Sequence, residues 1–121
     1  MKKLSLKPES VQQNHKEWIG VDLDGTLAYY DYWRGKEDIG PPIPKMLMRI
    51  KQWIAEGKIV KIFTARATQD ENIPYIKAWL KQHDLEGLEI TCIKGMACIE
   101  FWDDKAIQII SNTGERVDGQ Y

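Results

Sequence analysis

The chain has 121 residues, which is enough for one domain with a hydrophobic core and too few for two. Hydrophobic residues make up 43% of it and charged residues 29%, the balance of an ordinary globular protein rather than of a disordered chain. The net charge of −1 gives no electrostatic reason to expect tight non-specific binding of nucleic acid, and no apolar run approaches the roughly 20 residues of a membrane span.

The first 16 residues are interpreted as an N-terminal arm that precedes a single domain over residues 17–121. The arm carries lysines but lacks the apolar segment of a secretion signal. Cys92 and Cys98 lack the Cys/His spacing of a zinc site, so they are expected to be reduced thiols. These features predict a cytoplasmic protein that has no membrane partner.

The first predicted strand leads into the segment I-G-V-D-L-D-G-T, residues 19–26. An apolar run that ends abruptly in Asp and Gly is typical of a buried parallel strand at the point where it leaves its sheet. Residues i and i+2 leave a strand on the same side, so Asp22 and Asp24 can face one site. Two neighbouring carboxylates stay ionised only when a cation or strong donors lie between them, and Mg²⁺ is the first candidate.

Residues 28–40 form a predicted loop that is rich in aromatic side chains. It is too polar for a core strand and too aromatic for an idle linker. Two interpretations stay open: the aromatic residues pin the loop to the body of the protein, or the loop touches the substrate, with Trp33 and Arg34 as its contacts.

The rest of the chain alternates between helical and strand patterns. In residues 41–57 apolar side chains recur at three- and four-residue spacings, which predicts a helix with Pro44 in its first turn. A second helix is expected to reach about His83, with Asn72 as its cap and Pro74 in its first turn. Further strands are predicted over residues 58–64, 88–93, 97–102 and 106–110.

Strands that alternate with helices predict an α/β fold with a largely parallel sheet. Parallel neighbours need a crossover of a dozen or more residues, but only residues 94–96 and 103–105 separate the last three strands. We therefore expect residues 88–93 to form a short edge strand and residues 106–110 to form a last strand that can run antiparallel.

Polar residues follow three of the predicted strands. Ligands of open α/β sheets bind at the carboxyl ends of the strands, so these residues are candidates for one site. The segment Thr64–Arg66 ends the second strand, where a hydroxyl and backbone N–H groups could hold phosphate oxygens, and Arg66 could clamp a phosphate or pair with a carboxylate. The pair Asp103 and Asp104 ends the fourth strand and could complete an Mg²⁺ shell. Lys94 is the first candidate for a compensating cation and Lys105 the second.

Taken in order, these segments resemble the four motifs of the haloacid dehalogenase superfamily of phosphotransferases, over roughly residues 18–113. D-x-D-G-T resembles the first motif, F-T-A-R the second, the lysine the third and W-D-D the fourth. In that family the first Asp is the nucleophile and the second is the general acid/base, which assigns these roles to Asp22 and Asp24. The resemblance implies a Rossmann-like three-layer sandwich, and the short gaps between motifs imply a minimal member that has no cap domain.

The activity implied by the resemblance is Mg²⁺-dependent hydrolysis of a phosphomonoester through an aspartyl-phosphate on Asp22. The predicted site then contains four groups of residues: catalytic Asp22, Asp24, Thr64 and Lys94; metal-binding Asp22, Asp24 and Asp103; substrate-binding Ala65, Arg66, Trp33 and Arg34; and Asp104 behind the metal ligands.

The substrate stays open at this point. A site without a cap suits a small phosphorylated metabolite or the phosphorylated end of a larger molecule, and a second subunit of a homo-oligomer could close it. Two other classes of protein also fit the residues: a receiver-like regulatory domain that accepts a phosphoryl group, and an inactive binding module related to the family.

Overall fold

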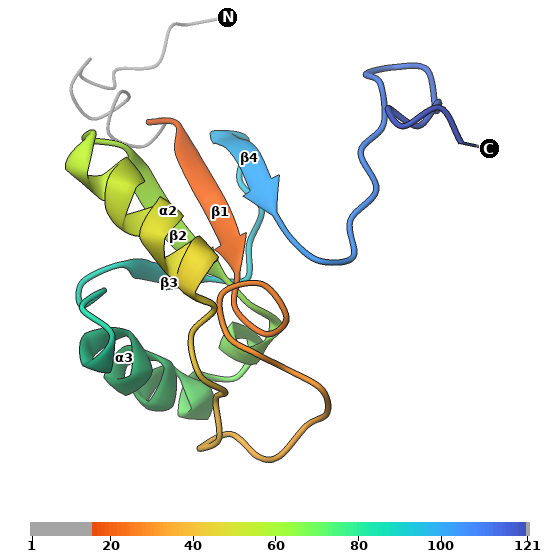
Figure 1. The fold of residues 1–121 in the computed structure, drawn as a ribbon. Coiled ribbons are helices and arrows are strands. Elements are labelled where there is room, and N and C mark those ends of the chain that lie inside the picture. The colour runs from red at the N-terminus through yellow and green to blue at the C-terminus, as the bar shows by residue number, and fades with distance from the viewer. Residues whose placement is uncertain (1–15, 121) are drawn as a thin grey trace, which may run out of the picture.

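The computed structural model describes residues 16–120, so nearly all of the predicted N-terminal arm lies outside the described residues. Its centre is a four-stranded sheet with the strand order β3-β2-β1-β4 (Figure 1). Every pair of neighbours is parallel, which confirms the predicted α/β fold with a parallel sheet. The strands are β1 (Trp18–Asp22), β2 (Ile59–Phe63), β3 (Glu89–Thr91) and β4 (Cys98–Trp102).

The register of the sheet brings the chemically important strand ends together. Asp22 lies opposite Phe63 on one side, and the preceding residue, Val21, lies opposite Trp102 on the other. The residues that follow β2 and β4 therefore flank the end of β1. This is the edge of a parallel sheet at which ligands bind.

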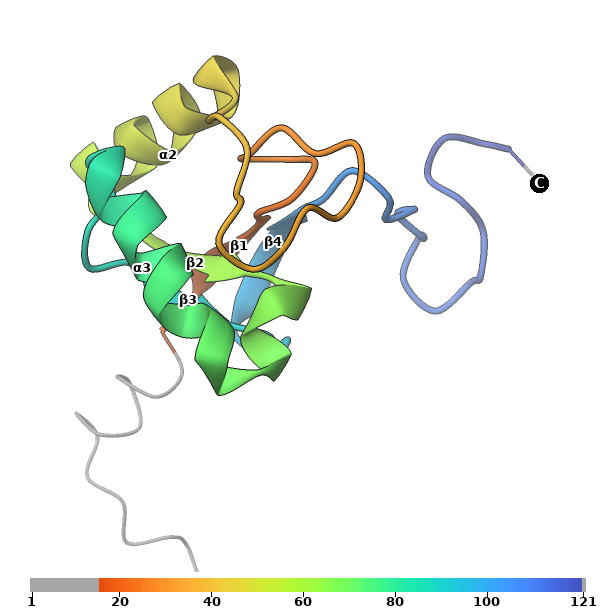
Figure 2. The same ribbon diagram turned by 90° about the horizontal axis from the view of Figure 1, so that it is seen from below.

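Both α-helices, α2 (Pro44–Ala55) and α3 (Ile73–Gln82), lie on the same face of the sheet (Figure 2). Alternate residues of β1 and β2 point to this face, because side chains alternate along a strand. They share one hydrophobic core with the inner stripes of both helices, and its fully buried members include Val21, Ile50, Ile62 and Ile76. Burial of each such side chain contributes about 1.5–3 kcal/mol.

The other face of the sheet carries no helix within residues 16–120. Phe63 and Phe101 pack edge to face there with their ring centroids 4.6 Å apart, and the Lys61 amine lies 4.5 Å from the centre of the Trp18 ring. The predicted three-layer sandwich is therefore not found in the described part of the chain, which forms two layers.

The crossover from β3 to β4, residues 92–97, explains why this second face lacks a helix. β3 and β4 lie at opposite edges of the sheet, so the segment must pass both β2 and β1. Gly95 lies against the Trp18 ring on the second face, and the Trp18 N–H donates to the Ala97 carbonyl at 3.0 Å. All six residues are needed to cross the sheet, so none is left to form a helix.

Several elements differ in detail from the predicted ones. The predicted edge strand is confirmed but spans only three residues in β3. Asn72 occupies the cap position of α3, yet its side chain makes no capping bond, because its amide donates to the Arg66 carbonyl at 2.9 Å. The aromatic loop contains no strand of its own; at its first residue, Ala28, it forms isolated bridges with Asp24 and with Pro42.

The predicted last strand over residues 106–110 is wrong. The segment does not join the sheet but turns back on itself in a tail that extends away from the body (Figure 1). Ile109 and Arg116 form an isolated antiparallel bridge, and Asn112 and Gly114 turn the chain between them with positive φ angles of 67° and 76°. The local turn satisfies the backbone of this segment, so the free edge of β4 is left unpaired in the described residues.

None of the helices in residues 16–120 combines the length and the hydrophobicity that crossing a membrane requires.

Candidate active site

A cavity of about 730 Å³ opens at the carboxyl edge of the sheet. Its walls come from the ends of β1, β2 and β4, from the aromatic loop and from the two short 3₁₀ helices η1 (Ala65–Thr68) and η2 (Asp70–Asn72). The sequence-predicted residues that line it are Asp22, Asp24, Trp33, Thr64, Ala65, Arg66, Asp103 and Asp104.

Three carboxylates converge in this cavity. One oxygen each of Asp22, Asp103 and Asp104 lies within 4.8 Å of the other two. Partial burial and the nearby charges of Asp103 and Asp104 raise the pKa of Asp22 to about 7. Such a cluster of oxygen ligands is the kind of site that binds a hard divalent cation.

The turn after β1 allows this convergence. The Leu23 carbonyl accepts the N–H groups of Thr26, Leu27 and Ala28 at 3.3, 3.0 and 2.8 Å, which closes one tight turn of the chain. Gly25 enters this turn with a φ of 90°, and a Cβ atom there would lie 2.5 Å from an oxygen of Asp104. Only glycine combines this backbone conformation with room for the neighbouring carboxylate.

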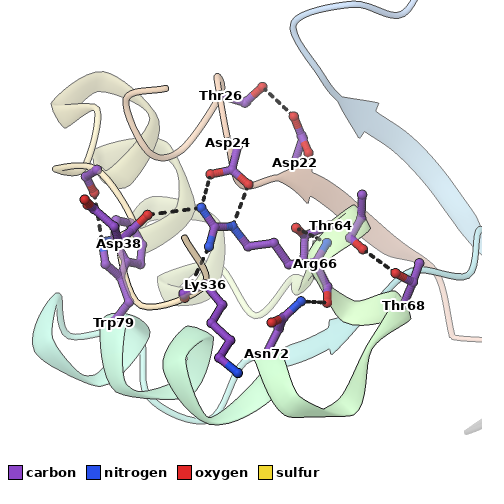
Figure 3. A network of polar contacts seen from close by, with 12 residues as sticks. Asp22, Asp24, Thr26, Lys36, Asp38, Thr64, Arg66, Thr68, Asn72 and Trp79 are labelled. Carbon is purple, nitrogen blue, oxygen red and sulfur yellow. Dashed lines mark hydrogen bonds and ion pairs between the residues drawn. The ribbon is translucent and has the colours of Figure 1, made fainter. Parts of the chain in front are cut away.

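Asp24 is held in a different way from the three converging carboxylates. Its oxygens accept hydrogen bonds from Nε and Nη2 of Arg66 at 2.8 and 2.9 Å (Figure 3). The Arg66 side chain is only 4% exposed, so the pair is well shielded from water on that side. The prediction placed Asp24 among the metal ligands through its backbone carbonyl, which this pairing does not involve. Among the side chains of residues 16–120, Asp104 joins Asp22 and Asp103 in the cluster.

Arg66 also fastens the aromatic loop over the site. Its Nη1 donates to the Lys36 carbonyl at 3.4 Å and its Nη2 to the Asp38 carbonyl at 3.3 Å, while its guanidinium carbon lies 4.7 Å from the centre of the Trp33 ring. Trp79 of α3 adds a second tie, because its indole N–H donates to the Gly40 carbonyl at 2.9 Å. Arg66 and Trp79 thus hold the loop through the carbonyls of Lys36, Asp38 and Gly40.

Thr64 is buried at the start of η1. Its hydroxyl oxygen accepts the Arg66 N–H at 3.1 Å and leaves the hydroxyl proton available to donate into the cavity. The Thr26 hydroxyl makes a long contact of 3.5 Å with the Asp22 carboxylate. Both hydroxyls therefore lie where they can orient oxygens near Asp22.

Two predicted site residues lie outside the cavity. Lys94 lines a neighbouring hollow beside β4, whereas Lys105, the second candidate, lines the cavity itself. Arg34 pairs with Asp31 at 2.8 Å and lies over the Tyr32 ring, away from the site. The short link between β3 and β4 explains the position of Lys94, because it draws that residue toward the second face of the sheet.

Sequence reasoning missed a group of residues on the outer wall. They come from the loop and from the 3₁₀ helices, where no periodicity marks which side chains point inward. The only available signal was their position directly after a predicted strand end. These residues are Tyr30, Lys36, Glu37, Thr68, Gln69, Glu71 and Asn72.

The fold and the site define an α/β protein with a carboxylate-lined cavity at the carboxyl edge of a parallel sheet. None of the family models, curated proteins and solved structures compared with this chain matches it.

Proposed function

We propose that the protein is a Mg²⁺-dependent phosphomonoester hydrolase of the haloacid dehalogenase type, with Asp22 as its nucleophile. The observation that carries the proposal is the convergence of Asp22 with Asp103 and Asp104 beside a separately held carboxylate, Asp24. Phosphoryl transfer needs a nucleophile, a cation site, donors for the phosphoryl oxygens and a proton shuttle. The cavity has a candidate for each of these needs.

The donor set fits a magnesium ion. Asp22, Asp103 and Asp104 would hold it through carboxylate oxygens, which are the ligands that this ion prefers. When bound, Mg²⁺ offsets the charge of the phosphoryl oxygens and favours the ionised form of Asp22. Without a cation, the raised pKa leaves Asp22 partly protonated near neutral pH.

The first chemical step uses the Asp22 carboxylate as a nucleophile. One of its oxygens forms a bond to phosphorus while the bond from phosphorus to the ester oxygen breaks, which leaves an aspartyl-phosphate. The departing oxygen takes a proton from Asp24. Asp24 lies two residues after Asp22, and Arg66 fixes the plane of its carboxyl group.

The second step returns the enzyme to its starting state. Asp24 takes a proton from a water molecule, whose oxygen attacks the same phosphorus and releases orthophosphate from Asp22. Each Asp24 oxygen accepts one hydrogen bond from Arg66 and retains a second lone pair, so the carboxylate can carry this proton without releasing the arginine.

The remaining groups bind the phosphoryl oxygens. Lys105 supplies the positive charge that the sequence had assigned first to Lys94, because only Lys105 lines the cavity. The Thr64 hydroxyl and the start of η1 supply neutral donors. Arg66 is engaged with Asp24 and the loop, so we assign it to positioning rather than to direct binding of phosphate.

The test is to trap and map the phosphoenzyme. The protein is incubated with p-nitrophenyl phosphate and Mg²⁺, quenched in acid and digested, and the peptides are weighed. We expect a mass increase of about 80 Da, one phosphoryl group, on the peptide that carries Asp22. Asp22→Asn should remove both this increase and turnover, whereas Asp31→Asn, a matched change in the exposed loop, should keep both.

The alternatives give different results in the same experiment. Stable phosphate on Asp103 without turnover would favour a receiver-like domain, and neither phosphate on any residue nor turnover would favour an inactive binding module. Activity of Asp22→Asn within tenfold of the parent protein would remove Asp22 from the role of nucleophile.

A further inference from the structure

The charges that line the cavity restrict what can be attached to the phosphate. Among residues 16–120, six acidic side chains and three basic ones line it. One divalent cation leaves this balance negative, so a substrate phosphate must find its compensation in the few basic groups. How each of these groups is already engaged therefore decides how many phosphates the cavity can hold.

Arg66 is not available to a substrate. Four of its five N–H groups donate to Asp24 and to the carbonyls of Lys36 and Asp38, and Trp33 covers its guanidinium. Releasing it would leave the Asp24 carboxylate without its partner and free the loop. A second phosphate gains nothing that would offset this loss.

Lys36 is balanced by acidic neighbours. Its amine lies 3.8 Å from the Glu71 carboxylate, and Glu37, the next residue along the chain, also lines the cavity. The Lys36–Glu71 pair is exposed and weak, but a phosphate that approaches Lys36 also approaches two carboxylates. The outer part of the cavity is therefore neutral to negative.

Lys105 is the one basic residue of the cavity that forms no ion pair with any residue in 16–120. It follows directly after Asp103 and Asp104, beside the candidate cation site. The cavity thus offers compensation for one phosphoryl group, at the position where the chemistry takes place.

The outer wall offers aromatic surface in place of charge. Tyr30 and Trp33 line the cavity while remaining 40% and 53% exposed, so part of each ring faces solvent. An exposed aromatic face binds the apolar face of another ring, such as a sugar or a base, and does not require charge on it. Thr68 and Gln69 add neutral polar groups to the lining of the cavity.

From this arrangement, and resting on the proposed function, we propose that the substrate is a monophosphate ester whose leaving group is uncharged and contains a ring. Substrates with a second phosphate or a carboxylate on the leaving group are expected to be poor, because Glu37 and Glu71 would repel the extra charge and Lys105 is the one unpaired basic residue that residues 16–120 place in the cavity.

The experiment compares matched esters by the release of orthophosphate in the presence of Mg²⁺. The first pair is glucose 6-phosphate with glucose 1,6-bisphosphate, and the second is glycerol 3-phosphate with 3-phosphoglycerate. We expect kcat/KM to fall at least about tenfold within each pair when the negative charge is added, which corresponds to about 1.4 kcal/mol. Equal or better use of the charged partner would overturn the proposal.

Two pairs of variants test the wall itself. Trp33→Ala should raise KM for glucose 6-phosphate about tenfold and change that for glycerol 3-phosphate little, whereas Tyr32→Ala, an exposed aromatic that does not line the cavity, should change neither. Equal effects of Trp33→Ala on both substrates would show that the ring is not recognised.

Glu71→Gln should raise the ratio of bisphosphate to monophosphate activity, because it leaves Lys36 unopposed. Glu86→Gln removes the same charge beside a different cavity and should leave the ratio unchanged. If Glu71→Gln does not raise the ratio, the charge argument is wrong. Failure of every ester, with no phosphate on Asp22, overturns the proposed function together with this inference, whereas turnover without discrimination overturns this inference alone.

Discussion

The two halves of the site are built in opposite ways. The half formed by β1, β2 and η1 holds Asp24 and Arg66 in a shielded, doubly hydrogen-bonded pair with the buried Thr64 beside it. The half that follows β4 is open: Asp104 and Lys105 are exposed, and the Asp103 carboxylate accepts only the N–H groups of the next residues, at 2.6 and 3.1 Å. Under the proposed function, the closed half would fix the geometry of proton transfer, while the open half would exchange cation and phosphate with solvent.

The largest effect should come from removing the proton carrier of the closed half. Asp24→Asn is expected to lower the rate for an alkyl phosphate about 10²- to 10⁴-fold, the usual contribution of a positioned acid or base. With p-nitrophenyl phosphate the leaving group needs no proton, so phosphoenzyme formation should suffer less than its hydrolysis and a burst of p-nitrophenol should appear. Stopped-flow absorbance measures this. Equal losses for both esters without a burst would contradict the acid–base role.

Breaking the shielded pair should cost both stability and rate. Arg66→Met leaves Asp24 partly buried without its partner, and we expect a loss of about 2–4 kcal/mol in the free energy of unfolding. Arg66→Lys restores one charge but not the two-point contact, so it should recover part of the stability. Urea denaturation measures these changes. If Arg66→Met is as stable as the parent protein, the Asp24–Arg66 pair does not stabilise the closed half of the site.

A smaller effect is expected where the halves touch. Gly25→Ala places a methyl group against the Asp104 carboxylate at a positive φ, which costs about 1–2 kcal/mol and displaces that carboxylate. The variant should lose more affinity for Mg²⁺ than Gly57→Ala, where φ is also positive but no atom lies nearby. Calorimetric titration with Mg²⁺ compares the two. Equal affinities would show that Asp104 does not contribute to the cation site.

The smallest effect concerns the charge of Asp22 in the absence of a cation. Its pKa is raised to about 7 in the folded protein, so the folded state binds more protons than the unfolded state between about pH 4 and 7. Stability without Mg²⁺ should therefore fall as the pH rises through this range.

Asp22→Asn should remove this fall and raise Tm at pH 8 by roughly 4 °C, which corresponds to about 1 kcal/mol after screening by solvent. Thermal melts at pH 4 and pH 8 in EDTA provide the measurement, and the gain should vanish at pH 4. A gain of the same size at both pH values would point to packing and not to charge.

The closed half could largely be predicted from the sequence, and the open half only in outline. The D-x-D-G-T segment predicted β1, its turn and the two aspartates, because the apolar run and the glycine each dictate local structure. The strand that precedes Thr64 followed from the same pattern. The choice of Asp24 as the partner of Arg66 did not, because 42 residues separate the two and only the sheet register brings them together.

The position of the third-motif lysine shows the same limit. The sequence ranked Lys94 before Lys105, but in the structure Lys105 lines the cavity whereas Lys94 lines a hollow beside β4. Only the course of the crossover separates them. Residues 106–110 were predicted to be a strand because their composition is apolar and β-branched. In the structure the chain instead turns at Asn112 and Gly114, because this turn provides hydrogen-bond partners for the backbone within the segment itself.

The crossover over residues 92–97 has a consequence for how the chain folds. From the end of β3 it must reach the start of β4, three strand spacings sideways and most of a strand length back, which is roughly 20 Å. Seven Cα steps reach at most about 25 Å, so the segment has almost no slack. Once β1, β2 and β3 are aligned, the segment therefore holds the start of β4 close to its place beside β1.

Pairing of β1 with β4 joins residues far apart in sequence, and such contacts form late and slowly. Asp22 can belong to the folded nucleus, whereas Asp103 and Asp104 arrive with the last strand. Until β4 has docked, Asp22 lacks Asp103 and Asp104 beside it, so the carboxylate cluster is complete only when the sheet is complete.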